Sequence, residues 1–165
     1  MSDLLSLNDK QALYFLWVTI LNQSQKADVV LEKTLNLFER LGIKENFNKF
    51  YPLLTYEKII SAVTQKPAIH RFPKNMSENL FLSIENIKKN YSNKPCLLFQ
   101  NFSELKEIKQ RLLKFRGIGK HKADVAIIIF ENFFRISDSI NNRNNCDTLF
   151  LTLDKELSII NSLKG

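Results

Sequence analysis

The stretch Phe115-Arg116-Gly117-Ile118-Gly119-Lys120-His121-Lys122-Ala123-Asp124 decides the fold that we predict for this chain. It contains two of the four glycines, one residue apart. Apolar residues recur at helical spacing on both sides of it, namely Leu105, Ile108, Leu112 and Phe115 before the glycines and Ala123, Ala126, Ile127 and Phe130 after them. The pattern predicts two helices, over about 103–134, joined by a turn that is too tight for most side chains.

This turn is predicted to bind a phosphate group. Gly117 and Gly119 can both take positive φ and leave their N–H groups uncovered. Those N–H groups lie at the start of the second helix, where the helix dipole favours an anion. Arg116, Lys120 and Lys122 add positive charge around them, and in a basic protein such a phosphate is expected to belong to nucleic acid. A Gly-x-Gly between helices can equally be a plain tight corner.

Length and composition indicate a single domain over 1–165 with its own core. The chain is 44% hydrophobic, includes 13 Phe, and has no apolar run long enough to span a bilayer. Its start, Met1-Ser2-Asp3-Leu4, lacks a basic segment, so we expect no signal peptide, no membrane partner and a cytoplasmic protein, associated with the nucleoid in a bacterium. The net charge of +7 suits a polyanion, although surface lysines without a function would give the same value.

The cysteine and histidine counts argue against a metal centre. Cys96 and Cys146 cannot build a four-thiolate zinc or iron–sulfur site, and only His70 and His121 could supplement them. We therefore expect no metal and no cofactor. Two reduced thiols are expected, and a Cys96–Cys146 disulfide is the alternative.

The remaining periodicity predicts an all-α protein. Asn8 and Gln11 form a capping-box pattern, Gly42 a helix stop, and Thr55, Ser103 and Asp147 candidate N-caps. The predicted helices, apart from the pair around the glycines, are 8–22, 27–41, 55–63, 75–91 and 148–163. The β-branched run 126–130 is assigned to helix because it lies within a helical pattern. Two segments are predicted as connections, one over 66–73, whose His70-Arg71 could touch a phosphate or simply pack, and one over 135–145.

Three motifs in this order resemble those of the helix-hairpin-helix, Gly/Pro-Asp superfamily of base-excision DNA glycosylases, the endonuclease III-like group. They are the Gln-containing loop Leu21-Asn22-Gln23-Ser24-Gln25, the hairpin Lys114 to Ala123, and the segment Cys146-Asp147-Thr148. The stretch Gln65 to Pro73 is also similar to one in some uncharacterised bacterial members. The resemblance covers roughly Tyr14 to Asp147.

The resemblance implies a DNA-glycosylase-like bundle with two helical subdomains and a DNA-facing cleft. The hairpin, including Ile118, would clamp the DNA backbone, and the damaged base would be flipped out of the duplex. Asp147 would stabilise the cationic sugar as the N-glycosidic bond breaks, although Asp147 can also be a simple N-cap. Gln23, with Gln25 in reserve, would fill the gap left by the base, and a plain polar loop is the alternative.

The sequence departs from this family at the position of the catalytic lysine. His121 occupies the place of the lysine nucleophile of the bifunctional members, and Lys120 and Lys122 point about 100° away from it on a helix. A monofunctional, water-using enzyme is therefore expected, in which His121 orients water or contacts DNA. The spacing from His121 to Asp147 is longer than in endonuclease III, and Asp138 is a rival at shorter spacing.

The chain ends about one helix after Asp147 and lacks the four-cysteine cluster of many relatives, so the second subdomain is minimal or truncated, or the protein is no longer an enzyme. Two functions remain open: a monofunctional DNA glycosylase acting on double-stranded DNA, and a catalytically degenerate relative that binds DNA without sequence preference. A helical protein-interaction domain is a third possibility, for which the hairpin would be a coincidence.

Overall fold

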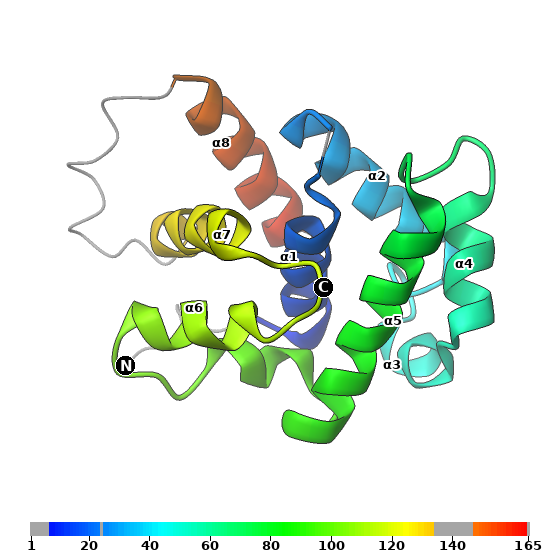
Figure 1. Ribbon diagram of the computed structural model, residues 1–165, viewed down its shortest axis with the longest axis horizontal. Helices are drawn as coiled ribbons and strands as arrows, with labels where there is room; N and C mark the ends of the chain where they lie inside the picture. Colours follow the sequence, from blue (N-terminus) through cyan, green and yellow to red (C-terminus); the bar gives the residue numbers. More distant parts are fainter. Residues whose placement is uncertain (1–6, 24, 134–146, 165) are drawn as a thin grey trace.

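The computed structural model describes residues 7–23, 25–133 and 147–164, without the side chains of residues 133 and 147–154. In these ranges the chain forms eight α-helices and two short 3₁₀-helices and has no strand, so the all-α prediction is confirmed (Figure 1). The elements are α1 (Asp9–Leu21), α2 (Ala27–Arg40), α3 (Phe47–Phe50), η2 (Tyr51–Leu53), α4 (Tyr56–Thr64), α5 (Pro73–Asn90), η3 (Pro95–Phe99), α6 (Leu105–Leu113), α7 (Lys120–Phe133) and α8 (Asp147–Ser162).

Helix α1 is the centre of the molecule. Every residue from Gln11 to Leu21 is buried, as expected for a helix that is apolar on all sides. Figure 1 shows α1 between α7 and α8 on one side and α2 and α5 on the other, and α1 packs against all four. The polar groups of its buried tryptophan and tyrosine are satisfied, because the Trp17 indole N–H donates to Ser83 Oγ and the Tyr14 hydroxyl donates to the Leu31 carbonyl.

The local signals for several helix ends are confirmed. Asn8 and Gln11 form the predicted capping box of α1, and Thr55 caps α4 by accepting from the Lys58 N–H. Gly42, just after α2, has φ +77°, the left-handed conformation of a helix stop.

Two helix starts differ from the prediction. Helix α5 begins at Pro73, two residues earlier than expected, because proline fits the first helical position, where no N–H partner is needed. The N-cap of α6 is Glu104 rather than Ser103. The Glu107 carboxylate accepts from the N–H groups of both Ser103 and Glu104. Glu104 and Glu107 form a capping box, which fixes the start of α6 one residue later than predicted.

Two arginines have structural roles that their charge alone would not reveal. Arg40 and Arg111 each donate to three backbone carbonyls of a nearby loop, Arg40 to those of Ala62, Gln65 and Pro67 and Arg111 to those of Leu98, Gln100 and Asn101. Both guanidinium groups thereby hold connections between helices.

Helices α6 and α7 pack against each other and are joined by residues 114–119. The run 126–130 is helical, as predicted.

Asp147 is the first residue of α8 rather than the residue before it, and its side chain lies outside the described residues. The connection 135–145, with Asp138, and Cys146 also lie outside them. Cys96 has no disulfide partner among the described residues, and the Cys96–Cys146 alternative is untested. None of the helices in the described ranges combines the length and apolar character that a bilayer crossing requires.

Candidate nucleic-acid interface

The two glycines of the turn have different structural reasons to be there. Gly117 has φ +93°, and a Cβ at this position would lie 2.6 Å from Nδ2 of the buried Asn79 on α5. The fold therefore requires glycine at 117 for two reasons, the positive φ and the close contact with Asn79. Gly119 does not have a positive φ, which corrects the expectation for this residue, and a Cβ there would meet no atom within 4 Å. The fold leaves open space at Gly119.

Several backbone N–H groups of the turn have no acceptor among the described residues. They are those of Gly117, of Gly119 and of Lys120 and His121 at the start of α7. The Gly119 carbonyl accepts from the Ala123 N–H at 3.0 Å, so the helix begins directly after it and its first N–H groups point outward. Ile118 is different, since its N–H donates to the Phe115 carbonyl and its side chain is buried.

Exposed side chains surround these N–H groups. His121 is one of them, and the others are the cations Lys114, Arg116 and Lys120. One of them is partly neutralised, because Arg116 Nη1 lies 3.3 Å from Oε2 of Glu78 on α5. The uncovered N–H groups and these cations together make the turn a positively charged site for an anion.

Lys122, predicted to bind phosphate, is directed into the protein instead. Its Nζ donates to the carbonyl oxygen of Ile20 at 2.7 Å, in the last turn of α1. Burial lowers the pKa of Lys122 to about 8. A cation at a helix C-terminus is favoured by the dipole, so Lys122 ties α7 to the end of α1.

The Gln loop, defined here as Asn22, Gln23 and Gln25, follows the same end of α1. Gln23 is exposed, and its N–H donates to the Leu21 carbonyl at 2.8 Å. The Gln23 carbonyl faces Nε2 of His70 at 3.0 Å. Gln25 is half-buried. The bond between Lys122 and Ile20 thus brings this loop and the glycine turn to the same region.

Phe72 is a part of this region that was not predicted from the sequence. Phe72 is 41% exposed, and the Arg71 guanidinium lies 5.0 Å from its ring centre. A shallow pocket of about 490 Å³ surrounds the pair, lined by residues 71–75 and by Glu78, the partner of Arg116. The available signal was an aromatic residue between an arginine and a proline that starts a helix.

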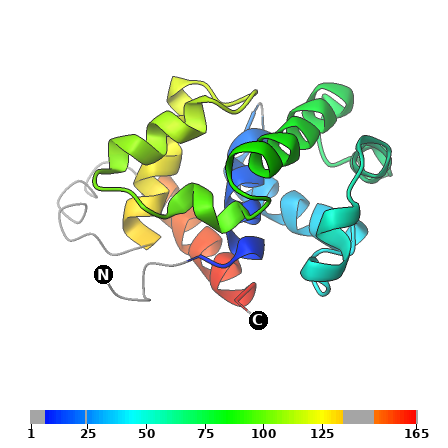
Figure 2. The same ribbon diagram turned by 90° about the horizontal axis from the view of Figure 1, so that it is seen from below.

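Three segments therefore meet around the C-terminal end of α1: the glycine turn (residues 114–121), the Gln loop and the Arg71–Phe72 turn. We call their common surface the turn face. In Figure 2 the glycine turn reaches toward α5, in agreement with its contacts to Glu78 and Asn79. None of these contacts is visible in the local sequence pattern.

The predicted catalytic pair is only half described. His121 is exposed in the first turn of α7, next to the uncovered N–H groups. Asp147 begins α8, which packs against α1 and α2, but the position of its carboxylate lies outside the described residues. A joint role of His121 and Asp147 therefore stays a prediction.

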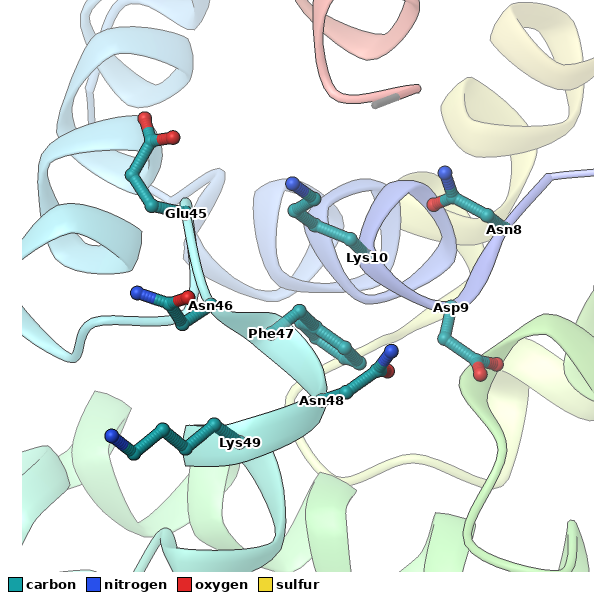
Figure 3. Close-up of a pocket in the computed structure, with 8 residues that line it drawn as sticks. All are labelled: Asn8, Asp9, Lys10, Glu45, Asn46, Phe47, Asn48 and Lys49. Atoms are coloured by element: carbon teal, nitrogen blue, oxygen red, sulfur yellow. The ribbon is translucent and has the colours of Figure 1, made fainter.

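A second pocket, of about 510 Å³, lies at the opposite end of α1, between residues 8–10 and residues 45–49 (Figure 3). Two of its four charged side chains, Lys10 and Asp9, are used by the protein itself. Lys10 Nζ donates to the Lys44 carbonyl at 2.6 Å, and the Asp9 carboxylate accepts from the Cys96 N–H at 3.0 Å. No group of three or more His, Cys, Asp or Glu side chains in the described ranges could hold a metal ion. We therefore place the candidate site at the turn face.

Comparison with known proteins identifies no relative. No protein-family model, no curated protein and no solved structure matches this chain. The resemblance of the glycine turn, the Gln loop and Asp147 to the glycosylase motifs thus rests on the residues of this sequence alone.

Proposed function

We propose that this protein binds the backbone of duplex DNA through the turn face, as a helix-hairpin-helix protein of the DNA glycosylase type. The observation that supports this most directly is the row of N–H groups at Gly117, Gly119 and the start of α7, which have no acceptor in the described part of the chain and are bordered by exposed cations. Such a row is suited to the oxygens of one phosphate group. Contacts of this kind position a protein on DNA and carry no sequence information.

The difference between the two glycines favours binding over a plain corner. A corner explains Gly117, where both φ and Asn79 exclude a side chain. It does not explain Gly119, where a side chain would find open space. A ligand that approaches the backbone closely accounts for the absence of a side chain at 119.

The proposed reaction is the monofunctional removal of a damaged or mispaired base. The bond between the base and sugar C1′ breaks and the departing base takes the bonding electrons. A water oxygen adds to C1′ and gives up one proton, and the base gains one proton as it leaves. Asp147 would stabilise the positive charge that develops on the sugar, and His121 would orient the water or contact DNA. Gln23 and Phe72 are both exposed on the turn face, and in this proposal they would occupy the space that the flipped base leaves.

Substitution of Gly119 tests the binding site directly. In Gly119→Leu the added side chain enters open space, so we expect an unchanged melting temperature, but it covers the N–H groups. Affinity for an undamaged 20-base-pair duplex, measured by fluorescence anisotropy in low salt, should fall at least about tenfold, the loss of a charge-assisted phosphate contact.

A matched pair of lysines provides the control for charge. Lys120→Gln removes a cation beside the turn, and Lys89→Gln removes one near the far end of α5. The slope of log affinity against log salt should decrease by about 1 for Lys120→Gln only. Equal slopes for the two variants, or an unaffected Gly119→Leu, would contradict binding at the turn.

The enzymatic part needs its own experiment. A panel of duplexes with damaged and mispaired bases is incubated with the protein and with Asp147→Asn, and abasic sites are revealed by alkali. We expect excision of at least one base by the parent protein alone, and no adduct trapped by borohydride, because a water-using enzyme forms no Schiff base. If DNA binds but no base is released above the Asp147→Asn level, the protein is a DNA-binding module without this chemistry.

A further inference from the structure

His70 connects two of the three segments of the turn face, although its own side chain is only 1% exposed. Its Nε2 lies 3.0 Å from the carbonyl oxygen of Gln23 in the Gln loop. Its Nδ1 lies 3.0 Å from the backbone nitrogen of Phe72. The ring is thus a bridge between segments that contact each other through no other hydrogen bond described for them.

The two partners fix the protonation state of the ring. A backbone N–H can only donate, so Nδ1 accepts from Phe72. In the neutral ring the proton is then on Nε2, which donates to Gln23. An imidazolium carries a proton on both nitrogens and would present a donor to the Phe72 N–H. Protonation therefore breaks the bond to Phe72 and keeps the bond to Gln23.

The surroundings of His70 oppose protonation. Burial is the main cause that lowers the pKa of His70 below its ordinary value of 6.5, and the positive charges of Lys122 on α7 and Lys33 on α2 act in the same direction. The carbonyl groups of Gln23 and Leu21 act in the opposite direction. The ring is neutral at pH 7. Its contribution to stability is complete above pH 6.5 and is lost as the pH falls through that value toward the lower pKa of the folded protein.

The geometry points to His70 as a positioning residue that joins the Gln loop to the Arg71–Phe72 turn, so that both segments meet DNA in one fixed arrangement only while the ring is neutral. This inference rests on the proposed DNA binding, but the bridge is a property of the free protein. The buried ring itself touches no ligand. Its effect on DNA is exerted through Gln23 and Phe72, which are exposed.

The first experiment examines the bridge without DNA. The chain has two histidines, so His121→Gln leaves His70 as the only one that titrates. In this background the ring signals of His70 and the amide signals of Phe72 and Gln23 are followed by NMR from pH 8 to pH 4.5. We expect a common midpoint below 6.5 and faster solvent exchange of the Phe72 amide after protonation. A ring that titrates without any change at Phe72 would overturn the bridge.

The second experiment measures affinity of the same His121→Gln protein for an undamaged 20-base-pair duplex at pH 7.0 and pH 5.0 and equal ionic strength. We expect about fivefold weaker binding at pH 5.0, the size of one lost hydrogen bond. His70→Asn in this background keeps an acceptor for the Phe72 N–H and cannot titrate. The affinity of this variant for the duplex should therefore be equal at the two pH values. An equal pH dependence with and without His70 would overturn the inference. If the parent protein with both histidines binds no duplex at either pH, the proposed function fails, and the amide titration alone decides whether the bridge exists.

Discussion

The two ends of α1 are held in opposite ways. At the N-terminal end the polar groups are satisfied by nearby parts of the protein, as Asn8 caps its own helix and reaches the Leu163 and Lys164 carbonyls, and Gln11 donates to the Ile160 carbonyl. At the C-terminal end Lys122 donates to the Ile20 carbonyl in the last turn of α1, and His70 bonds the Gln23 carbonyl just after the helix. Around them lie N–H groups that have no acceptor among the described residues.

This difference separates a folding role from a binding role. A capped end that closes on α8 contributes to stability and offers little to a ligand. An end that gathers loops around uncovered N–H groups and exposed cations stabilises the fold less, and its unused hydrogen-bonding capacity is available to an anion. Substitutions at the N-terminal end should therefore change stability alone, and those at the turn face should change DNA affinity.

The largest effect on stability is expected from Glu156, which lies in α8, the helix whose C-terminal part contacts the N-terminal end of α1. Its side chain is 1% exposed, its Oε1 has no hydrogen-bond partner among the residues that the structure describes, and burial raises its pKa to about 8. The contribution of Glu156 to stability is complete below pH 4.5 and is lost as the pH rises through about 8, because the folded state favours the neutral acid. Glu156→Gln should therefore be more stable than the parent at pH 8.5, by on the order of 3 kcal/mol.

Urea unfolding at pH 5.0 and pH 8.5 measures this difference. The difference in the free energy of unfolding between parent and variant should be small at pH 5.0 and large at pH 8.5. DNA affinity at pH 7 should be unchanged. Parallel stabilities at the two pH values would show that the carboxyl group is not buried in the folded protein.

Gly117→Ala comes next, and it is the one substitution expected to affect both properties. A positive φ costs a non-glycine residue about 2 kcal/mol, and the added methyl group also displaces Asn79. Thermal unfolding should show this loss of stability, and fluorescence anisotropy should show a weaker affinity for duplex DNA. Gly119→Ala is the control, with no loss of stability. If Gly117→Ala were as stable as the parent, the turn would have a different conformation.

The sequence predicted those features that depend on residues close together along the chain. The capping box of Asn8 and Gln11, the cap at Thr55 and the stop at Gly42 involve neighbours within one helical turn, so the sequence displays them completely. The helix pair around Gly117 was predicted for the same reason, because its periodicity is local.

Features that depend on how helices pack were missed. The direction of Lys122 follows from the rotation of α7 against α1, and charged residues in an amphipathic pattern are ordinarily exposed. The burial of Glu156 and the exposure of Phe72 have the same origin. A single sequence also contains no signal for the ion pair of Arg116 with Glu78 on α5.

Asn8→Ala should lower stability by about 1 kcal/mol, the usual cost of removing a helix cap. The Asn8 side chain caps α1 and holds the end of α8, so both contacts are lost. Urea unfolding measures the loss of stability. DNA affinity, measured at a urea concentration well below the unfolding transition, should equal that of the parent. A change in affinity would mean that the two ends of α1 are not independent.

The smallest effect, and the sharpest for the turn face, is expected from Glu78→Gln. The Glu78 and Arg116 side chains are 36% and 54% exposed, so their ion pair contributes little to stability, and the melting temperature should not change. For DNA the pair matters in another way, because the Glu78 carboxylate repels phosphate and occupies Arg116. Its removal should strengthen duplex binding about twofold to threefold in low salt, with the gain disappearing in high salt. Glu85→Gln, further along α5, removes the same charge away from the turn and should have no such effect. Equal gains for the two variants would mean that net charge, and not the position of Arg116 beside the uncovered N–H groups, governs binding.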